Sequence, residues 1–433
     1  MFPVVNKTKD KLRKIRKCLK SNSYDDSWAD FLTPVTFAKD ISSEKMRLNL
    51  CIPNLEQSKM YGGQRTALRF FLSLLKQLNC DGRILIESSY NTEIERKLNN
   101  QYPGWEIGPS MNGAASRQIV SITPRDRQSL SLPIRERDIF LYTYWSGGYV
   151  LSSYREAQNT FFGHHQPHLH LIQDFEPAFT SWSSRYMLAD SVFRQRDGIA
   201  IFNSEELANW FDRLGYSYLS HFVFTPKLDP DLAVRLKNVS AFAKKPLLVF
   251  YGRPYVPRNC FGLVVKSLQL LLQQHPEVGD NWRILSIGSS IPSVNLADGK
   301  KLETTGKMSM SDYAALMEQT AVGVSLMCSP HPSYPPLEMA AFGIRTITNS
   351  FVTKDLSQYV SNIVSLPEVT FQSLADAIWE QICASEKSMN VSIPTFSGVY
   401  SGYLQSDADF FDGCVEGVAQ QIRDFLSAGT MKS

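Results

Sequence analysis

The chain has 433 residues, 43% of them hydrophobic and 12% aromatic, which excludes a largely disordered protein and favours two domains of roughly 200 residues each. Its seven cysteines stand singly, and the absence of a Cys-x-x-Cys pair argues against a zinc site and a disulfide framework and favours the cytoplasm. The formal net charge is only +3, and no apolar run is long enough for a signal peptide or a membrane span.

The charge is concentrated near the amino terminus, where residues 7–20 hold eight Lys or Arg and one Asp. Leu12, Ile15 and Leu19 recur there at helical spacing, so we expect residues 1–45 to form a basic, helical N-terminal extension. Such a helix can lie on the anionic inner face of the cell membrane, gaining about 1 kcal/mol per basic residue. A solvated leader helix explains the pattern equally well, and nucleic acid is not an expected partner.

From residue 46 short apolar runs alternate with helical patterns, which is typical of a doubly wound parallel sheet. The first half predicts strands at 48–52, 83–87, 139–143, 168–172 and 198–202. Gly62 and Gly63 follow the first strand and precede a helix that carries Ala67 to Leu75. The prolines at 226 and 230 disfavour a continuing helix, so we place the domain boundary after residue 228.

The second half, residues 229–404, repeats the α/β pattern with strands at 247–250, 284–287, 322–327 and 345–349 and a helix at 261–273. The remaining segment, 405–433, has apolar residues at helical spacing and can pack back on the first domain. We therefore expect two facing Rossmann-like domains, with ligands in the cleft where the carboxyl ends of the strands meet.

Two arginines follow the first strand of the second domain, Arg253 in the run Tyr251-Gly252-Arg253-Pro254 and Arg258 five residues later. A guanidinium donates several hydrogen bonds from one planar, charged fork, which suits phosphate. Such groups stabilise a departing diphosphate more strongly as its negative charge grows. Lys307, after Gly306, can add a further positive charge, although each of these residues alone could be an ordinary solvated side chain.

The longest motif is the run from Ser329 to Glu338, between a strand and a helix. Proline suits the first turn of a helix, and the unpaired N–H groups there form an anion site. Glu338 lies one turn inside, where its carboxylate can accept hydrogen bonds from ribose hydroxyls. The predicted donor-binding set is Gly63, Arg253, Arg258, Lys307, His331, Ser333, Tyr334, Pro335, Leu337 and Glu338.

The strand from His168 ends in two carboxylates, Asp174 and Glu176, which could orient or deprotonate an acceptor hydroxyl. With Arg253 they form the predicted catalytic set. Histidines at 164, 165, 168 and 170 suggest a metal site, but no second cluster completes it. The Asp-x-Asp patterns at 229–231 and 407–409 follow no convincing strand. We therefore expect neither a metal nor a cofactor beyond the donor substrate.

These motifs together resemble family 4 glycosyltransferases of the GT-B fold, and the resemblance covers nearly the whole chain from residue 46. The runs 173–177, 251–254 and 329–338 are similar to those of bacterial rhamnosyltransferases that use dTDP-L-rhamnose to build surface and S-layer glycans. Asn203 and Ser204 resemble the turn of this family before a helix. Arg258 stands where the wider family has a lysine, and His331 stands where it has the first of two glutamates seven residues apart.

The resemblance implies a metal-independent transfer that retains anomeric configuration, with the donor in the second domain and a glycan or lipid-linked saccharide acceptor in the first. It places Arg253, Arg258 and Lys307 near the diphosphate and Glu338 on the ribose. Two other functions stay open at this point: a sugar-nucleotide epimerase or hydrolase of the same fold, and a non-catalytic partner in a polysaccharide assembly complex.

Overall fold

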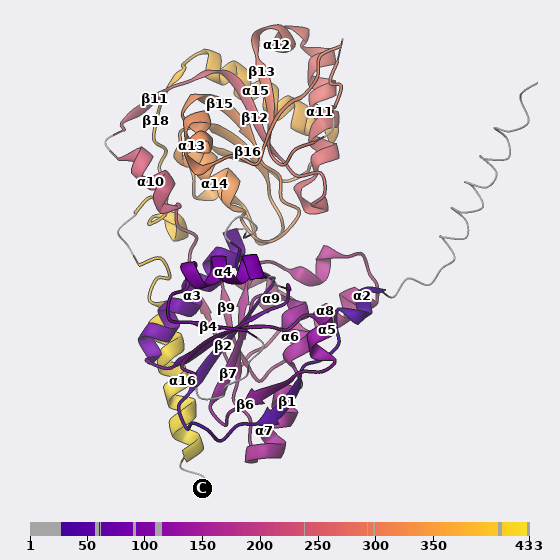
Figure 1. The fold of residues 1–433 in the computed structure, drawn as a ribbon. Helices are drawn as coiled ribbons and strands as arrows, with labels where there is room; N and C mark the ends of the chain where they lie inside the picture. The colour runs from indigo at the N-terminus through magenta and orange to yellow at the C-terminus, as the bar shows by residue number, and fades with distance from the viewer. Residues whose placement is uncertain are drawn as a thin grey trace, which may run out of the picture.

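The computed structural model describes residues 27–56, 60, 62–89, 92–108, 115–237, 239–291, 293–297, 299–405 and 409–430. It contains two α/β domains, each built on a parallel sheet, stacked one above the other (Figure 1). The fold class expected from the sequence is therefore confirmed. The basic segment 7–20 and part of the pattern 407–409 lie outside the described residues. Within the described ranges, no helix is both long and apolar enough to cross a membrane.

The first domain contains an eight-stranded sheet in the order β10-β9-β8-β7-β2-β3-β5-β4, in which every pairing is parallel. Its central strands are buried on both faces, which is why they appear in the sequence as nearly continuous apolar runs. The bounds are β2 Arg47–Ile52, β3 Asp81–Ile86, β4 Glu106–Ile107, β5 Arg117–Ser121, β7 Asp138–Tyr142, β8 His168–Ile172, β9 Gly198–Phe202 and β10 Ser220–Val223. Each of the five predicted strands is present.

Helices cover both faces of this sheet: α3 Gly62–Leu78, α4 Thr92–Gln101, α5 Pro124–Arg127, α6 Trp145–Leu151, α7 Tyr154–Phe162, α8 Ser184–Phe193 and α9 Glu205–Arg213. The C-terminal helix α16, Cys414–Thr430, lies against α3 and buries Val418 and Ile422 in the same core as Phe70 and Phe71 (Figure 1). The end of the chain thus packs on the first domain.

Residues 27–45 belong to the first domain, although we had expected them to be part of a separate extension. After the short helix α2, Ser27–Asp30, strand β1, Thr36–Lys39, pairs in parallel with β6, Ser131–Ile134. Val35 is buried in the hydrophobic cluster that also contains Phe140. Pairing between segments so far apart in the chain leaves no local pattern that would reveal it.

The second domain has a six-stranded parallel sheet in the order β14-β13-β12-β15-β16-β17. Its strands are β12 Lys245–Gly252, β13 Arg283–Gly288, β14 Glu303–Gly306, β15 Thr320–Val324, β16 Arg345–Asn349 and β17 Ile363–Leu366. Its helices are α10 Pro230–Leu236, α11 Phe261–Gln274, α12 Pro276–Asn281, α13 Met310–Gln319, α14 Tyr334–Ala341 and α15 Phe371–Glu386. A small ribbon pairs β11, Ala241–Ala243, with β18, Asn390–Ser392.

One predicted strand, 322–327, ends earlier than expected, because β15 stops at Val324. The backbone N–H of Met327 donates to the side chain of Asn349 at 2.8 Å instead of to a neighbouring strand. The chain therefore leaves the sheet before the motif that begins at Ser329. Between the domains, residues 224–229 form neither helix nor strand and Pro230 begins α10, with Phe224 in the core of the first domain and Leu228 in the core of the second.

Candidate functional site

Three of the predicted site residues, Asp174, Arg258 and His331, meet at the domain interface, which we define as the contact between the loops after β8 and β9 and the loops after β12, β15 and β16. Parallel strands present their carboxyl ends at one edge of a sheet, so the two sheets contribute their loops to the same region. Contacts across the interface join Asp174 and Asn203 of the first domain to Arg258, Ser329 and His331 of the second. Polar residues of both domains therefore meet at this interface.

Asp174 is the best-connected residue of the interface. Its Oδ2 lies 3.1 Å from Nε of Arg258, and its Oδ1 accepts hydrogen bonds from the Ser329 hydroxyl and from N–H of Phe175. The Arg258 guanidinium also lies over the ring of Phe179, 4.0 Å from its centroid. Both oxygens of this buried carboxylate are thus occupied, which suits a residue that positions other groups.

Lys354, after β16, approaches the same region from the second domain. Its Nζ donates to the carbonyl of Met327 at 2.7 Å, and the side chain is buried. Burial lowers the pKa of Lys354 to about 8, while the charge of Asp174 opposes that shift. The neighbouring residue, Thr353, also reaches the first domain: its hydroxyl donates to the carbonyl of Glu206 in α9 at 2.7 Å. The β16 loop therefore also ties the domains together.

His331 links the long motif to the first domain. N–H of Ser333 donates to its Nδ1 at 2.9 Å, and the side-chain amide of Asn203 lies 3.0 Å from its Nε2. The Asn203 atom that lies 3.0 Å from Nε2 is the amide nitrogen Nδ2, and which of the two nitrogens donates depends on the tautomer of the ring. Burial lowers the pKa of His331 to about 4, so the ring is neutral near pH 7.

Glu176 lies beside Asp174 on the first domain. One carboxyl oxygen accepts from N–H of Trp145, the first residue of α6, at 2.7 Å. Burial raises the pKa of Glu176 to about 8, and the negative charge of Asp174 adds to the rise. A large share of this carboxyl is therefore protonated at neutral pH, which favours hydrogen-bond donation over proton abstraction.

The predicted phosphate ligands of the second domain follow β12 and β14. Arg253 is half-buried and lies against Gly288, the last residue of β13. A Cβ added at Gly288 would lie 3.4 Å from Cγ of Arg253. Gly288 and Gly306 have φ values of +103° and +67°, a conformation that favours glycine. Lys307, directly after Gly306, is exposed. These loops bring two cations to one edge of the sheet.

Glu338 is partly buried in α14 and accepts a hydrogen bond from the hydroxyl of Tyr313 in α13 at 2.9 Å. Burial raises the pKa of Glu338 to about 7. The helix begins at Tyr334 after Ser333, which has a φ of +70°, and prolines fill its first turn. The dipole of α14 is positive at this end, but the Ser333 N–H donates to His331 and the two prolines have no N–H, so the dipole is the main feature there that favours an anion.

The remaining predicted donor contacts fall in different places. Pro335 is partly exposed, whereas Ser333 is buried and burial raises the pKa of Tyr334. Leu337 is wholly buried in the hydrophobic core of the second domain, so it supports α14 instead of facing a ligand. Gly63 accepts a hydrogen bond from Nε2 of Gln173 at 3.0 Å, and a Cβ there would lie 3.1 Å from Oε1 of the same side chain.

Sequence reasoning missed three residues of this region: Ser329 as a partner of Asp174, Lys354, and Tyr313 as the donor to Glu338. Lys354 lies five residues after the end of β16, at the carboxyl edge of the sheet where ligands are expected. This position could have identified it as a candidate. Nothing in the sequence marks Tyr313. Among the described residues no group of three or more His, Cys, Asp or Glu is arranged to hold a metal ion.

Comparison with known proteins places both domains in one family. The family model for the N-terminal domain of WsaF matches residues 47–205, and the model for its C-terminal domain matches residues 246–379. The O-antigen biosynthesis protein RfbC of Myxococcus xanthus is 27% identical over 219 residues. That match covers 49% of this chain but only 15% of RfbC.

Solved structures show the same fold at low sequence identity. Sucrose-phosphate synthase of Thermosynechococcus elongatus is 15% identical, covers 90% of this chain over all of its own length, and superposes with a TM-score of 0.53. Alr3699/HepE of Anabaena, solved in complex with UDP-glucose, is 13% identical, covers 88% of this chain over all of its length, and has a TM-score of 0.51. The shared architecture is the GT-B fold.

Proposed function

This chain belongs to the WsaF family of GT-B glycosyltransferases, and we propose that it transfers L-rhamnose from dTDP-L-rhamnose to a growing surface polysaccharide. The relative RfbC, whose name assigns it to O-antigen biosynthesis, supports the class of product. The choice of rhamnose rests on the resemblance of the runs 173–177, 251–254 and 329–338 to those of rhamnosyltransferases. The proposed acceptor is a glycan or a lipid-linked saccharide.

The observation that carries this proposal is the arrangement of the second domain around Glu338. Its carboxylate, held by Tyr313 at 2.9 Å, lies one turn inside a helix whose dipole is positive at that end and favours phosphate. Arg253 follows β12 and Lys307 follows β14, which lie on either side of β13 in the same sheet. A ribose on Glu338 and a diphosphate on the helix start and the two cations would place the sugar at the domain interface.

The same arrangement supports a route for the reaction. The bond between the anomeric carbon and the phosphate oxygen breaks, and its electron pair leaves with the nucleoside diphosphate, which Arg253 and Lys307 stabilise. The acceptor hydroxyl oxygen forms the new bond to the anomeric carbon and gives up its proton. Glu176 is largely protonated near neutral pH and both oxygens of Asp174 are engaged. We therefore assign that proton to a phosphate oxygen of the leaving group, as a retaining mechanism allows.

The test is a transfer assay with radiolabelled dTDP-L-rhamnose, UDP-glucose and other nucleotide sugars, and with synthetic rhamnose-containing acceptors. Elongated product from dTDP-L-rhamnose alone is expected, and the anomeric configuration of the product, read by NMR, tests retention. Release of free rhamnose or an altered nucleotide sugar without elongation would indicate a hydrolase or an epimerase. Product from another donor would exclude rhamnose but keep the transferase.

Matched variants test the site. We expect Arg253→Ala and Glu338→Ala to lower kcat/KM by about 100-fold, since each removes a charged contact to the donor. The controls are Arg283→Ala, which breaks an exposed ion pair with Glu303 at the opposite end of β13, and Glu318→Ala, whose partner is Arg235. Wild-type activity in the first two variants would contradict the site assignment.

A peripheral position on the membrane through residues 7–20 is part of the same proposal. Sedimentation with anionic vesicles tests it, because a chain that lacks these residues should lose binding at low salt while keeping transfer to a soluble acceptor.

A further inference from the structure

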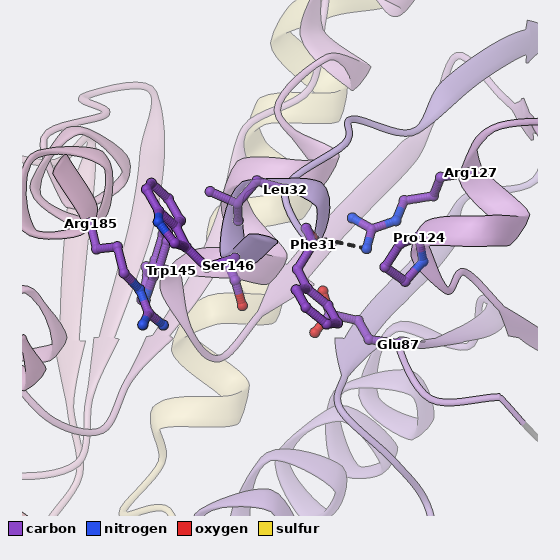
Figure 2. A pocket seen from close by; sticks show the side chains of 9 residues that line it. Phe31, Leu32, Glu87, Pro124, Arg127, Trp145, Ser146 and Arg185 are labelled. Atoms are coloured by element: carbon purple, nitrogen blue, oxygen red, sulfur yellow. Dashed lines mark hydrogen bonds between the residues drawn. The ribbon is translucent and has the colours of Figure 1, made fainter. Parts of the chain in front are cut away.

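The first domain contains a cavity of about 230 Å³ at the carboxyl edge of its sheet (Figure 2). Glu87 follows β3, Pro124 begins α5 after β5, and Trp145 begins α6 after β7. The segment before β1 closes one side, and we call residues 27–35 the N-terminal arm. The lining residues are Trp28, Phe31, Leu32, Glu87, Pro124, Arg127, Trp145, Ser146 and Arg185.

The walls combine aromatic faces with a few polar groups, as sites for small polar molecules do. Trp28, Phe31 and Trp145 supply the rings, and Phe31 is 63% exposed although it is a large apolar side chain. Arg185 is exposed and lies over the ring of Trp28, 5.8 Å from its centroid. An exposed phenylalanine and two tryptophans around a hollow are better explained by a ligand than by the core of the domain.

Glu87 is the acidic group of the cavity. Its carboxylate accepts a hydrogen bond from the hydroxyl of Tyr144 at 2.6 Å, which fixes its orientation and leaves acceptor capacity on the other oxygen. Burial raises the pKa of Glu87, and the nearby Arg127 opposes that rise. A partly buried carboxylate held in this way is suited to accept from hydroxyl groups of a neutral ligand.

Arg127 is the basic group, and it holds the arm in place. It is buried and donates to the carbonyls of Thr33 at 2.9 Å and Phe31 at 3.0 Å, one of which is drawn in Figure 2. Its Nε has no hydrogen-bond partner among the described residues. That atom is closed off from solvent, so Arg127 supports the arm and adds positive charge behind the wall instead of offering a free N–H to a ligand.

The cavity is connected to the domain interface through Trp145. Its backbone N–H donates to Glu176 at 2.7 Å, and Glu176 is two residues from Asp174, which pairs with Arg258 of the second domain. In the sheet, β7 and β8 are neighbours, so the loops that carry Trp145 and Asp174 lie side by side. A saccharide seated on Trp145 would extend toward the place where the proposed donor sugar sits.

We propose that this cavity binds one neutral pyranose unit of the acceptor, with its ring on Trp28 and Trp145 and its hydroxyls on Glu87. The inference rests on the proposed function, because it names the acceptor subsite of that reaction. A carboxylated or phosphorylated sugar fits less well, because Glu87 would face its charge. The arm precedes residue 47, where the match to the family model begins.

Binding of simple glycosides tests the cavity without requiring turnover. Saturation-transfer NMR would use methyl α-L-rhamnopyranoside, methyl α-D-mannopyranoside, methyl α-D-glucopyranoside and methyl α-D-galactopyranosiduronate on the full chain. We expect signal from at least one neutral glycoside and its loss in Trp28→Ala and Glu87→Gln. Trp182→Ala is the control, since that side chain is 94% exposed and does not line the cavity. No signal from any neutral glycoside, or a stronger signal from the uronate, overturns the proposal.

In the transfer assay the same two variants should raise the acceptor KM by about tenfold, the effect of one lost hydrogen bond or ring contact. Affinity for the nucleotide sugar, measured by calorimetry, should stay unchanged. An unchanged acceptor KM in both variants overturns the cavity assignment, even where transfer itself is confirmed. Failure of the proposed function would appear differently, as wild-type protein without turnover. If Glu87→Gln lowers the Tm, Trp28→Ala alone decides the outcome, with Trp182→Ala as its control.

Discussion

Asp174 of the first domain and Arg258 of the second form an ion pair across the domain interface, with Oδ2 and Nε 3.1 Å apart. Each residue follows a strand of its own sheet, β8 or β12, so the pair fixes the two carboxyl edges relative to each other. Both were predicted site residues with different tasks, an acceptor contact and a diphosphate contact. Their pairing joins the predicted acceptor side of the site to the predicted donor side.

We expect Arg258→Ala to lower kcat/KM by about 10- to 100-fold, because misplaced half-sites lose alignment of donor and acceptor. The cost in unfolding free energy should be below about 1 kcal/mol, since the pair is partly exposed. Steady-state kinetics and thermal unfolding separate the two effects, with Arg283→Ala as control. A double-mutant cycle with Asp174→Asn should give a coupling energy of about 0.5 to 3 kcal/mol in the activation free energy. Additive effects would mean that the pair does not act as a unit.

The sequence predicted the sheets well because parallel strands buried on both faces leave a direct signature, and Ile199 to Phe202 is an example. It also located most side chains of the candidate site, since the motifs directly follow strands. The contacts between those side chains could not be predicted. Asn203 and His331 lie 128 positions apart, and their contact depends on how the two domains dock. The N-terminal arm was missed for the same reason, because the pairing of β1 with β6 has no local signal.

Buried polarity could not be predicted either. Nothing in the sequence distinguishes Glu176, Glu338 and His331 from solvated residues of the same types. Burial nevertheless raises the pKa of the two glutamates and lowers that of the histidine, which favours the neutral form of each. Leu337 shows the opposite case, because its place in a functional motif suggested a ligand contact while the structure places it in the core. The degree of burial depends on the packed tertiary structure.

His331→Gln should lower kcat/KM by about tenfold without changing the shape of the pH profile between pH 6 and 8. The folded ring has a pKa of about 4, so it is neutral throughout that range and has no proton to gain. The loss comes from Nδ1, which no longer accepts from Ser333. The measurement is kcat/KM against pH, with the exposed His221→Gln as control. A wild-type inflection near pH 6.5 that disappears in the variant would contradict a neutral His331.

Asp138→Asn should destabilise the first domain by about 3 to 5 kcal/mol at pH 7, because it leaves buried arginines unpaired. The carboxylate of Asp138 accepts from Arg47 at 2.8 and 2.6 Å, and both side chains are wholly buried. Although burial alone would raise the pKa of Asp138, the guanidiniums of Arg47 and Arg83 hold it below its usual value. Its stabilisation is therefore present at neutral pH and lost as the pH falls through that lowered pKa.

Urea unfolding of the Asp138 variant and of Asp280→Asn provides the comparison, since Asp280 forms an exposed ion pair with Lys300. The second substitution should change the free energy of unfolding by less than about 1 kcal/mol. Equal effects of the two substitutions would show that the buried network contributes no more than a surface pair.

Glu338→Gln should raise stability and lower activity. The folded pKa of Glu338 is about 7 and its ordinary value is 4.5, so between these values the folded state keeps a proton that the unfolded state has released. The free energy of unfolding therefore falls as the pH rises across this window, and above about pH 7 the full cost of a charged Glu338 is present. Glutamine removes that cost, which we place at about 1 to 3 kcal/mol because the side chain is only partly buried.

The Tm of Glu338→Gln should therefore exceed that of the wild type at pH 8. At pH 5 the two Tm values should be closer, because Glu338 of the folded wild type is then mostly protonated and neutral, like glutamine. Donor affinity should fall by about tenfold at pH 8, since an amide accepts more weakly from the ribose than a carboxylate does. The opposite pH trend, with the largest difference in Tm at pH 5, would show that Tyr313 and its surroundings stabilise the charged carboxylate. A gain in stability with unchanged donor affinity would show that Glu338 does not contact the donor. The stability lost by charging this carboxyl would then have no counterpart in donor binding.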